Sequence, residues 1–182
     1  LSSYLGSQAH PEVTPSHSDC KAALADTEQR IQRLFGVGGG RSVESFHKDL
    51  GEAMLDKCGM SRTKDGLNAL IAQIRGFREA FWNEVRVPGT ANRPNPELEK
   101  GLRVADFLEF AETMAIDARE RAESCGGHFR EEFQTPEGEA QRNDEAFTHA
   151  SAWEFNGVGA DPTLHAEPLT FEFVTPSQRS YK

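Results

Sequence analysis

The densest group of chemically active side chains in the sequence lies between Arg121 and Glu132. This segment reads Arg-Ala-Glu-Ser-Cys-Gly-Gly-His-Phe-Arg-Glu-Glu. It combines guanidinium, carboxylate, hydroxyl, thiol and imidazole groups with two adjacent glycines, which allow backbone turns that other residues resist. The segment begins where a long helical pattern ends. Its composition suits a shaped polar surface that faces another body better than it suits a plain helix end.

Several groups in and near this segment are candidates for catalysis. Cys125 is a candidate reactive thiol, and adjacent carboxylates such as Glu131/Glu132 and Asp144/Glu145 could serve acid–base chemistry, because neighbouring acids push their pKa values apart. Adjacency in sequence does not place acids in a cleft, however, and most charged clusters are exposed. We therefore expect solvated or interface-paired acids, and a buried, inert thiol is the more frequent state for such a cysteine.

Two other patterns resemble cofactor or metal motifs without matching them. The run from Gly36 to Gly40 follows a helical pattern, not a strand, and does not fit G-x-G-x-x-G. It predicts a loop that ends a helix. The histidines are scattered, and no two have the spacing that places a pair of metal ligands on one helical face; they are His10, His17, His47, His128, His149 and His165.

Composition narrows the class of protein further. The chain has 182 residues, with 20 Lys plus Arg against 29 Asp plus Glu, a formal charge of −9 that disfavours nucleic-acid binding. No apolar stretch approaches the roughly 20 residues that span a bilayer, so we expect a soluble chain. Three widely spaced cysteines predict neither disulfides nor structural zinc, which fits a reducing cytosol. The start without Met suggests a piece of a longer polypeptide.

Helical periodicity dominates the first two thirds of the chain. Residues 18–35 form a first amphipathic pattern, and Ser42 is placed to cap a second helix. A third helix starts at Thr63 or Asp65 and continues through residue 86 with the strongest apolar stripe in the sequence. Asn95 and Pro96 mark the start of a fourth helix of about 28 residues. Alanines recur along one face of this helix, which predicts close approach to a neighbour.

After His128, glycine, proline and acidic residues predominate, with two β-like runs at 147–155 and 169–174. The predicted fold is mainly α: an antiparallel, spectrin-repeat-like bundle of three or four helices, followed by an extended arm in which the two short strands can pair. We expect an extended linker at 1–16, the bundle at 17–124 and the arm at 125–182. No βαβ pattern or internal repeat is present.

The sequence also resembles a known family. The segment from Arg121 to Arg130, the later Arg-Asn-Asp-Glu at 142–145 and the terminal Gln-Arg-Ser-Tyr at 178–181 are similar, in order and spacing, to the C-terminal region of succinate dehydrogenase and fumarate reductase flavoprotein subunits. Upstream, the stretches at 45–51, 56–60, 81–82 and 86–89 extend the likeness to nearly the whole chain. Many members have Arg where Cys125 stands, and the Cys-Gly-Gly-His-Phe-Arg-Glu-Glu form resembles the bacterial subgroup anchored by a cytochrome b subunit.

This resemblance implies a flavoprotein that interconverts succinate and fumarate and exchanges electrons with a membrane quinone, usually menaquinone in this subgroup. The implied partners are the flavin-binding domain of the same subunit, an iron–sulfur subunit and, through the complex, the cytochrome b anchor. The implied location is peripheral, on the cytoplasmic face of the bacterial inner membrane. FAD and the catalytic residues belong to domains that precede this region, so we expect the chain itself to bind no cofactor and to be inactive alone.

The residues that we expect at the domain or subunit interface are Arg121, Glu123, Ser124, His128, Arg130, Arg179 and Tyr181. Their expected role is charge-assisted hydrogen bonding that fixes the junction between domains. The leading hypothesis is the C-terminal helical domain of a succinate dehydrogenase flavoprotein. The alternatives are the same domain of a fumarate reductase or an L-aspartate oxidase-type flavoprotein, and a free-standing helical adaptor without a redox role.

Overall fold

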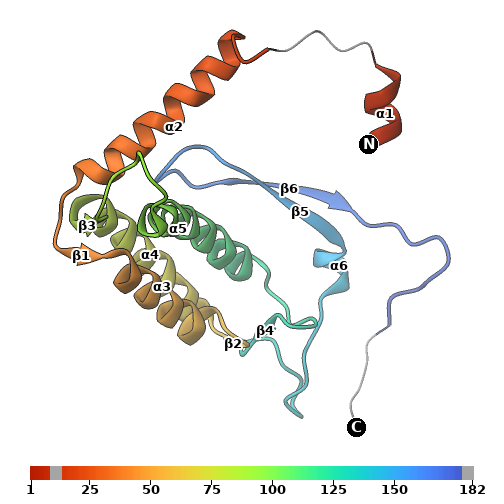
Figure 1. The fold of residues 1–182 in the computed structure, drawn as a ribbon. Helices are drawn as coiled ribbons and strands as arrows, with labels where there is room; N and C mark the ends of the chain where they lie inside the picture. Colours follow the sequence, from red (N-terminus) through yellow and green to blue (C-terminus); the bar gives the residue numbers. More distant parts are fainter. Residues whose placement is uncertain (9–13, 178–182) are drawn as a thin grey trace.

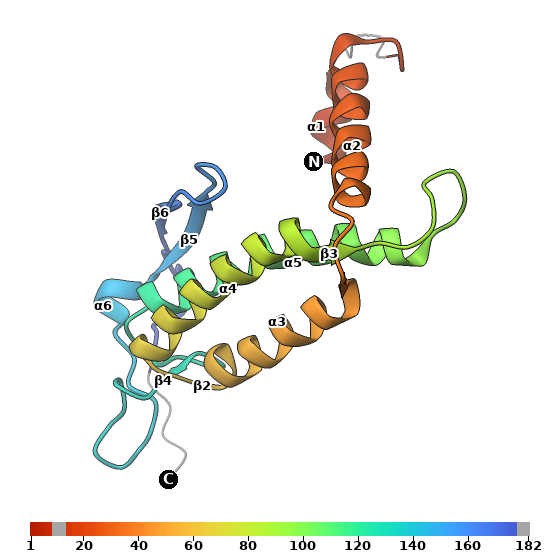
Figure 2. The ribbon, with the colours of Figure 1, turned by 90° about the vertical axis from the view of Figure 1, so that its left-hand side faces the viewer.

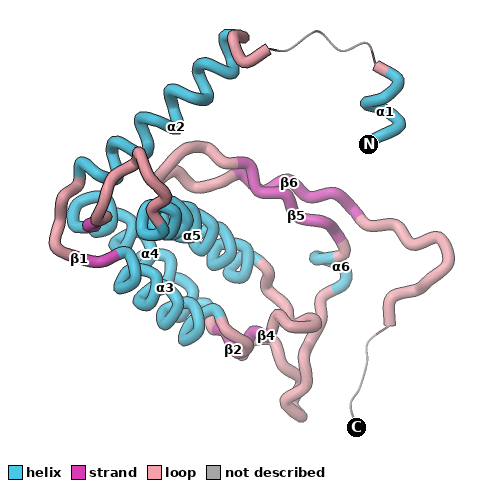
Figure 3. Tube along the Cα trace, in the orientation of Figure 1, coloured by secondary structure: helices cyan, strands magenta, loops and turns pink. Residues whose placement is uncertain are grey.

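A computed structural model describes residues 1–8 and 14–177 of the chain (Figure 1). Helices dominate the described residues and the strands are short, as Figure 3 shows, which confirms the predicted mainly α class. The helices are α1 (Ser2–Ser7), α2 (Ser18–Gly36), α3 (Val43–Cys58), α4 (Lys64–Glu84), α5 (Pro96–Glu120) and α6 (Asp144–Phe147). The strands are β1 (Arg41–Ser42), β2 (Ser61–Arg62), β3 (Val85–Arg86), β4 (Phe129–Arg130), β5 (His149–Glu154) and β6 (Thr163–Pro168).

The predicted capping residues start the three central helices. The hydroxyl oxygen of Ser42 accepts a hydrogen bond from the backbone N–H of Ser45 at 3.2 Å, and Thr63 accepts from Gly66 at 3.0 Å. The side-chain oxygen of Asn95 accepts from the N–H groups of residues 97 and 98, and Pro96 occupies the first helical turn of α5. These side chains satisfy amide donors that have no partner inside the helix.

Helices α3, α4 and α5 pack into the core of the molecule. The apolar stripe of α4 is buried as predicted, and Phe81 meets Phe46 of α3 edge to face with ring centroids 5.3 Å apart. The small residues Ala105, Ala111 and Ala115 of α5 are buried against these neighbours. Three of the three or four predicted helices therefore form the compact body, in which each helix packs against the other two.

Helix α2 is separate from this layer along most of its length. Leu34 near its C-terminal end is buried in the core, whereas Cys20 and Leu24 near its start are exposed. Figure 2 shows α2 rising away from the α3–α4–α5 layer. The predicted helix is confirmed, but the first half of its apolar stripe contacts no other part of the described chain that would bury it.

The N-terminal segment differs from its prediction. Residues 1–16 are expected to be extended, yet Ser2–Ser7 form a helix. Leu1, Tyr4 and Leu5 recur at the three- and four-residue spacing of a helix face. This pattern is too short, among the surrounding serines, to predict a helix from the sequence. Residues 9–13, which include His10, lie outside the described residues.

The loop from Gly36 to Gly40 ends α2, as predicted, and leads into a tight parallel pairing of β1 with β3. Gly38 adopts a φ of +59°, which favours glycine. Gly39 passes so close to the end of α4 that an added Cβ would stand 1.9 Å from the carbonyl oxygen of Glu84. The glycines at these positions are therefore explained by the backbone conformation and by the close approach of the chain to α4.

Strands β5 and β6 form an antiparallel hairpin over α5, with Trp153 opposite Leu164. The first β-like run is confirmed, but the strand predicted at 169–174 is wrong: the partner strand is Thr163–Pro168, and residues 169–177 form no strand. Phe171 and Phe173 alternate with Glu172 like strand residues, but they lie on an exposed segment. Pairing is instead fixed by the turn between the strands, where Gly157 and Gly159 have positive φ.

Candidate functional site

The segment after α5 folds back onto the start of α4. Its strand β4 pairs in parallel with β2, in register Arg62 to Arg130. Cys125 and His128 exchange backbone hydrogen bonds of 2.8 and 3.1 Å across a turn in which Gly126 has a φ of +61°. We call the polar cluster built on this turn the junction; it comprises Arg62, Arg121, Glu123, Ser124, His128, Arg130 and Glu132.

Arg130 is a deeply buried charged residue of the junction, with 2% of its surface exposed. Its Nη1 donates to the carbonyl oxygens of Ala118 and Arg119, both at 3.0 Å, at the C-terminal end of α5. A cation at this end also interacts favourably with the helix dipole. Ser124 holds the strand in place, because its hydroxyl accepts from the Arg130 N–H at 2.8 Å and donates to the Arg130 carbonyl at 3.0 Å.

Glu132 connects Arg130, which caps the C-terminal end of α5, to helix α4. One carboxylate oxygen accepts from the Nε of Arg130 at 3.1 Å, and the other accepts from the backbone N–H of Lys64 in the first turn of α4. Partial burial opposes ionisation, but these hydrogen bonds and the Arg130 charge prevail, so the pKa of Glu132 is lowered. The pair Arg130–Glu132 therefore bridges the end of one core helix and the start of another.

The ring of His128 is buried between two fixed partners. Nδ1 lies 2.7 Å from the Nη1 of Arg62, which can only donate, and Nε2 lies 2.8 Å from the carbonyl oxygen of Arg121, which can only accept. The geometry selects the neutral ring with its proton on Nε2. Burial lowers the pKa of His128; the Arg121 carbonyl opposes this, and the charges of Arg62, Arg121 and Arg130 lower it further.

Glu123 attaches the C-terminal arm to the junction. It is 2% exposed, and its Oε1 accepts two hydrogen bonds from the Arg121 guanidinium at 2.9 and 2.7 Å. Its Oε2 accepts from the backbone N–H of Asn143 at 2.8 Å, and Ser124 N–H donates to Gln141 O at 2.9 Å. The buried carboxylate therefore fixes where the arm leaves the helical body.

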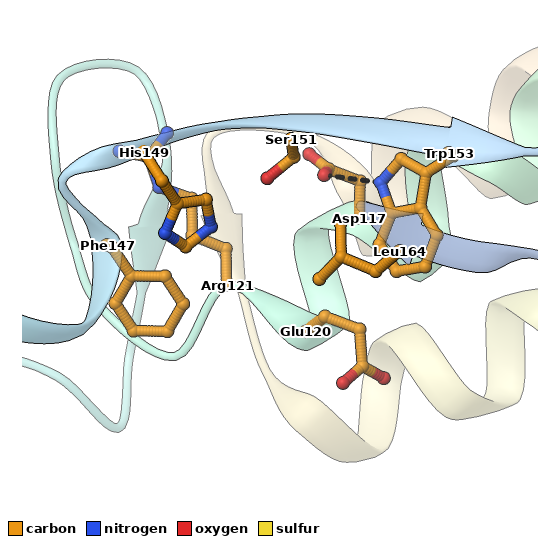
Figure 4. A pocket seen from close by; sticks show the side chains of 8 residues that line it. All are labelled: Asp117, Glu120, Arg121, Phe147, His149, Ser151, Trp153 and Leu164. Atoms are coloured by element: carbon orange, nitrogen blue, oxygen red, sulfur yellow. Dashed lines mark hydrogen bonds between the residues drawn. The ribbon is translucent and has the colours of Figure 1, made fainter. Parts of the chain in front are cut away.

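A cavity of about 300 Å³ opens beside the junction, between the end of α5 and the hairpin. Figure 4 shows Trp153 with its Nε1 donating to Asp117 at 2.8 Å, and His149 and Phe147 at the other end. The lining mixes acids and bases, but no nucleophile is hydrogen-bonded to a general base. Over residues 1–8 and 14–177, no three or more His, Cys, Asp and Glu are grouped to hold a metal ion. None of the described helices is long and apolar enough to cross a membrane.

The structure brings five of the seven predicted site residues together: Arg121, Glu123, Ser124, His128 and Arg130. Arg179 and Tyr181 lie outside the described residues. Cys125 is partly exposed, so the expectation of a buried thiol is wrong; the glycine turn keeps it near the surface. Glu131, Asp144 and Glu145 are exposed, as expected of solvated acids.

Sequence reasoning missed Arg62, because its partner His128 is 66 residues away and only the pairing of β2 with β4 joins them. The signal in the sequence that could have revealed this contact is a pair of short polar stretches. One precedes α4 and the other follows α5, and both lie at the same end of the bundle.

Comparison with known proteins identifies the fold. The family described as fumarate reductase flavoprotein C-term matches residues 47–181. The chain belongs to this family. The predicted resemblance to the C-terminal region of succinate dehydrogenase and fumarate reductase flavoprotein subunits is thereby confirmed.

Named relatives agree with this assignment. The chain is 30% identical over 181 residues to the fumarate reductase flavoprotein subunit of Escherichia coli, covering 97% of the chain and 29% of that protein. It is 22% identical over 171 residues to the succinate dehydrogenase flavoprotein subunit of Bacillus subtilis, covering 91% of the chain and 28% of that protein. The chain thus spans less than a third of the length of these relatives.

Solved structures share the fold. A quinol-fumarate reductase solved with menaquinol molecules matches with a TM-score of 0.76 and 25% identity, over 94% of this chain and 28% of that one. The Sdh1 complex of Mycobacterium smegmatis in its apo form matches with a TM-score of 0.68 and 20% identity, over 91% and 26%. This second likeness concerns the fold alone.

The residues described do not fit a flavin site. FAD-binding folds present a parallel sheet with a glycine-rich turn at a helix N-terminus, whereas the parallel pairs here are two residues long and the only longer strands form one antiparallel hairpin within the described residues. The junction is built to fix helix ends and the arm, and it leaves no cradle for the cofactor.

Proposed function

We propose that this chain is the C-terminal helical domain of a flavoprotein subunit that interconverts succinate and fumarate, and that it supports domain packing and subunit assembly. The observation that carries the proposal is the match to a quinol-fumarate reductase chain over 94% of the present chain with a TM-score of 0.76. The junction supports a bracing role, because its buried charges connect α5, α4 and the arm and contain no catalytic pair.

In this proposal FAD is bound by another region of the same subunit, and hydride transfer takes place on that cofactor. Residues 1–16 link to that region, residues 17–124 form the bundle and residues 125–182 form the arm. The partners are the flavin-binding region, an iron–sulfur subunit and, through the complex, a cytochrome b anchor. The complex lies on the cytoplasmic face of a bacterial inner membrane, where the flavoprotein is peripheral.

The direction of the reaction separates two candidates. The Cys-Gly-Gly-His-Phe-Arg-Glu-Glu form of the junction segment favours succinate dehydrogenase of the cytochrome b-anchored subgroup. The second candidate is fumarate reductase, which is favoured by the names of relatives such as those from Proteus vulgaris (28% identical over 171 residues) and Escherichia coli. Both candidates require the same domain and differ in the direction of the reaction.

The test uses the native complex that contains this sequence, purified from its source. Succinate-dependent reduction of a dye and fumarate-dependent oxidation of a reduced viologen are measured on one preparation. Faster succinate oxidation supports the dehydrogenase, and faster fumarate reduction supports the reductase. Activity with L-aspartate and none with either dicarboxylate contradicts both candidates.

The bracing role is tested separately by His128→Ala in the same complex. We expect less bound flavin or less assembled complex, because the Arg62 guanidinium loses its buried acceptor and the turn loosens. Cys20→Ala on the exposed part of α2 is the control. Unchanged flavin content and turnover in His128→Ala would remove this residue from the proposed role.

A further inference from the structure

The chain continues past the hairpin as an irregular segment, residues 169–177, which we call the strap. It leaves the end of β6 and forms an open loop outside α6 (Figure 1). Every residue of the strap is exposed, and its larger apolar side chains range from Leu169, which is 46% exposed, to Phe173, which is 87% exposed. A segment that buries so little apolar surface is held in place by a few specific contacts.

Hydrogen bonds attach the strap at its two ends. The backbone N–H of Leu169 donates to the carbonyl oxygen of Thr148 at 3.0 Å, which extends the pairing of the hairpin. The Nη1 of Arg142 donates to the carbonyl oxygen of Ser177 at 3.0 Å. No hydrogen bond joins residues 170–176 to any other described residue. The position of the far end of the strap therefore depends on Arg142.

The guanidinium group of Arg142 is itself oriented by its neighbours. Its Nε and Nη2 donate to the Oδ1 of Asp144 at 2.9 and 2.5 Å, so Nη1 is the nitrogen that remains for the strap. The next residue, Asn143, donates its backbone N–H to the buried carboxylate of Glu123 at 2.8 Å. Arg142 is thus attached to the junction and presents an oriented, charged donor, which forms a stronger hydrogen bond than a neutral one.

A cavity of about 210 Å³ lies between the strap and the segment that follows α5. The strap contributes Leu169, Phe171, Val174 and Pro176 to its lining, and the segment after α5 contributes Arg121, Glu123 and Cys125. Phe173 belongs to the strap but does not line the cavity. The strap therefore covers Cys125 and Glu123 across an open space, without the close packing of a protein interior.

We infer that the strap is a cover that opens and closes over this cavity, and that the hydrogen bond from Arg142 to Ser177 holds it closed. The structure describes the closed form. Opening breaks this hydrogen bond and exposes little further apolar surface, because Phe171 is already 51% exposed and Val174 67% exposed. Local openings that break so few contacts have low free energies. The open form gives large molecules access to the thiol of Cys125, whether or not the proposed function holds.

The thiol of Cys125 reports on the strap in the native complex that contains this sequence. The complex is treated with a maleimide that carries a bulky poly(ethylene glycol) chain, and thiols that remain free are labelled with N-ethylmaleimide after denaturation and quantified by peptide mass spectrometry. Arg142→Met removes the donor to Ser177. The control, Arg103→Met, removes an exposed pair with Glu99 on α5. Relative to the natural sequence, we expect modification of Cys125 to be about threefold faster or more in Arg142→Met and unchanged in Arg103→Met.

A second pair of variants leaves Arg142 unchanged. Phe171→Ser removes an aromatic side chain that lines the cavity. Phe173→Ser removes the same kind of side chain from a position that is 87% exposed and does not line the cavity. We expect Phe171→Ser to accelerate the modification of Cys125 and Phe173→Ser to leave it unchanged, because only the side chain of Phe171 loses apolar contacts when the strap opens.

Two other thiols distinguish opening of the strap from wider changes. Cys20 is exposed on α2 and should react at one rate in all variants, whereas Cys58 is 8% exposed in the core and should stay unmodified. A rise at Cys58 together with Cys125 means that the helical body has loosened, and it overturns the inference. Equal rates at Cys125 within either pair of variants overturn it as well. None of these measurements uses flavin content or turnover, so their results are separable from failure of the proposed function.

Discussion

Replacement of Arg130 by methionine tests whether the junction stabilises the helical body. Methionine keeps most of the side-chain volume and removes the two hydrogen bonds from Nη1 to the carbonyl oxygens at the end of α5. Hydrogen bonds from a charged donor contribute about 1.5 to 3 kcal/mol each. The contact with Glu132 adds little, because that side chain is 39% exposed and can be hydrated. We expect the free energy of unfolding to fall by about 3 kcal/mol.

The assay is equilibrium unfolding in urea, followed by the fluorescence of Trp82 in the bundle and Trp153 in the hairpin. Arg103→Met is the matched control: Arg103 pairs with Glu99 on the surface of α5, with both side chains 65% exposed. Such a pair contributes about 0.5 kcal/mol or less. Equal losses of stability in Arg130→Met and Arg103→Met would refute the view that the buried Arg130 side chain stabilises the junction.

Three further predictions concern pH, the hairpin and the glycine loop. The folded pKa of His128 lies below its ordinary 6.5, so the folded state binds fewer protons; stability contributed by the neutral ring is complete above pH 6.5 and is lost as the pH falls toward the folded pKa. Urea unfolding at pH 7.5 and 5.5 should therefore show a smaller pH effect in His128→Gln than in the natural sequence, and an equal effect would contradict the neutral ring. Trp153→Phe removes the hydrogen bond to Asp117 and should weaken the hairpin by about 1 kcal/mol, seen as faster amide exchange in residues 149–154 with exchange in α4 unchanged. Gly39→Ala should destabilise the chain by about 3 kcal/mol because its Cβ meets the end of α4 at 1.9 Å, whereas Gly40→Ala, with nothing within 4 Å, should change thermal stability little; similar melting temperatures would count against the close approach.

Local rules predicted the helices well. Ser42, Thr63 and Asn95 satisfy helix N-termini through short-range hydrogen bonds, and such signals are contained in a few adjacent residues. The burial of α4 followed from its unbroken apolar stripe. For the same reason the sequence could place Arg121 to Arg130 at the end of a helix and identify that region as a polar, turn-rich surface.

Local sequence patterns could not predict which residues pair when they are far apart in the chain. The contact between Arg62 and His128 depends on two-residue strands, and no periodicity can be read from two residues. The second hairpin strand was misplaced because the exposed Phe171 and Phe173 mimic strand alternation with large aromatic side chains. The true strand, Thr163–Pro168, gives a weaker signal, because only Leu164 and the small Ala166 alternate with its polar residues. The exposure of the first half of α2 also could not be predicted, because a helical pattern shows which residues share a face and does not show what packs on that face.

The most direct test of the central claim is the intact mass and visible absorbance of the native polypeptide that contains this sequence, read together with its succinate- and fumarate-dependent activities. A yellow protein several times larger than 182 residues that interconverts the two dicarboxylates is the predicted result. A colourless native protein of about this size, without either activity, would contradict the account and leave the helical adaptor as the alternative.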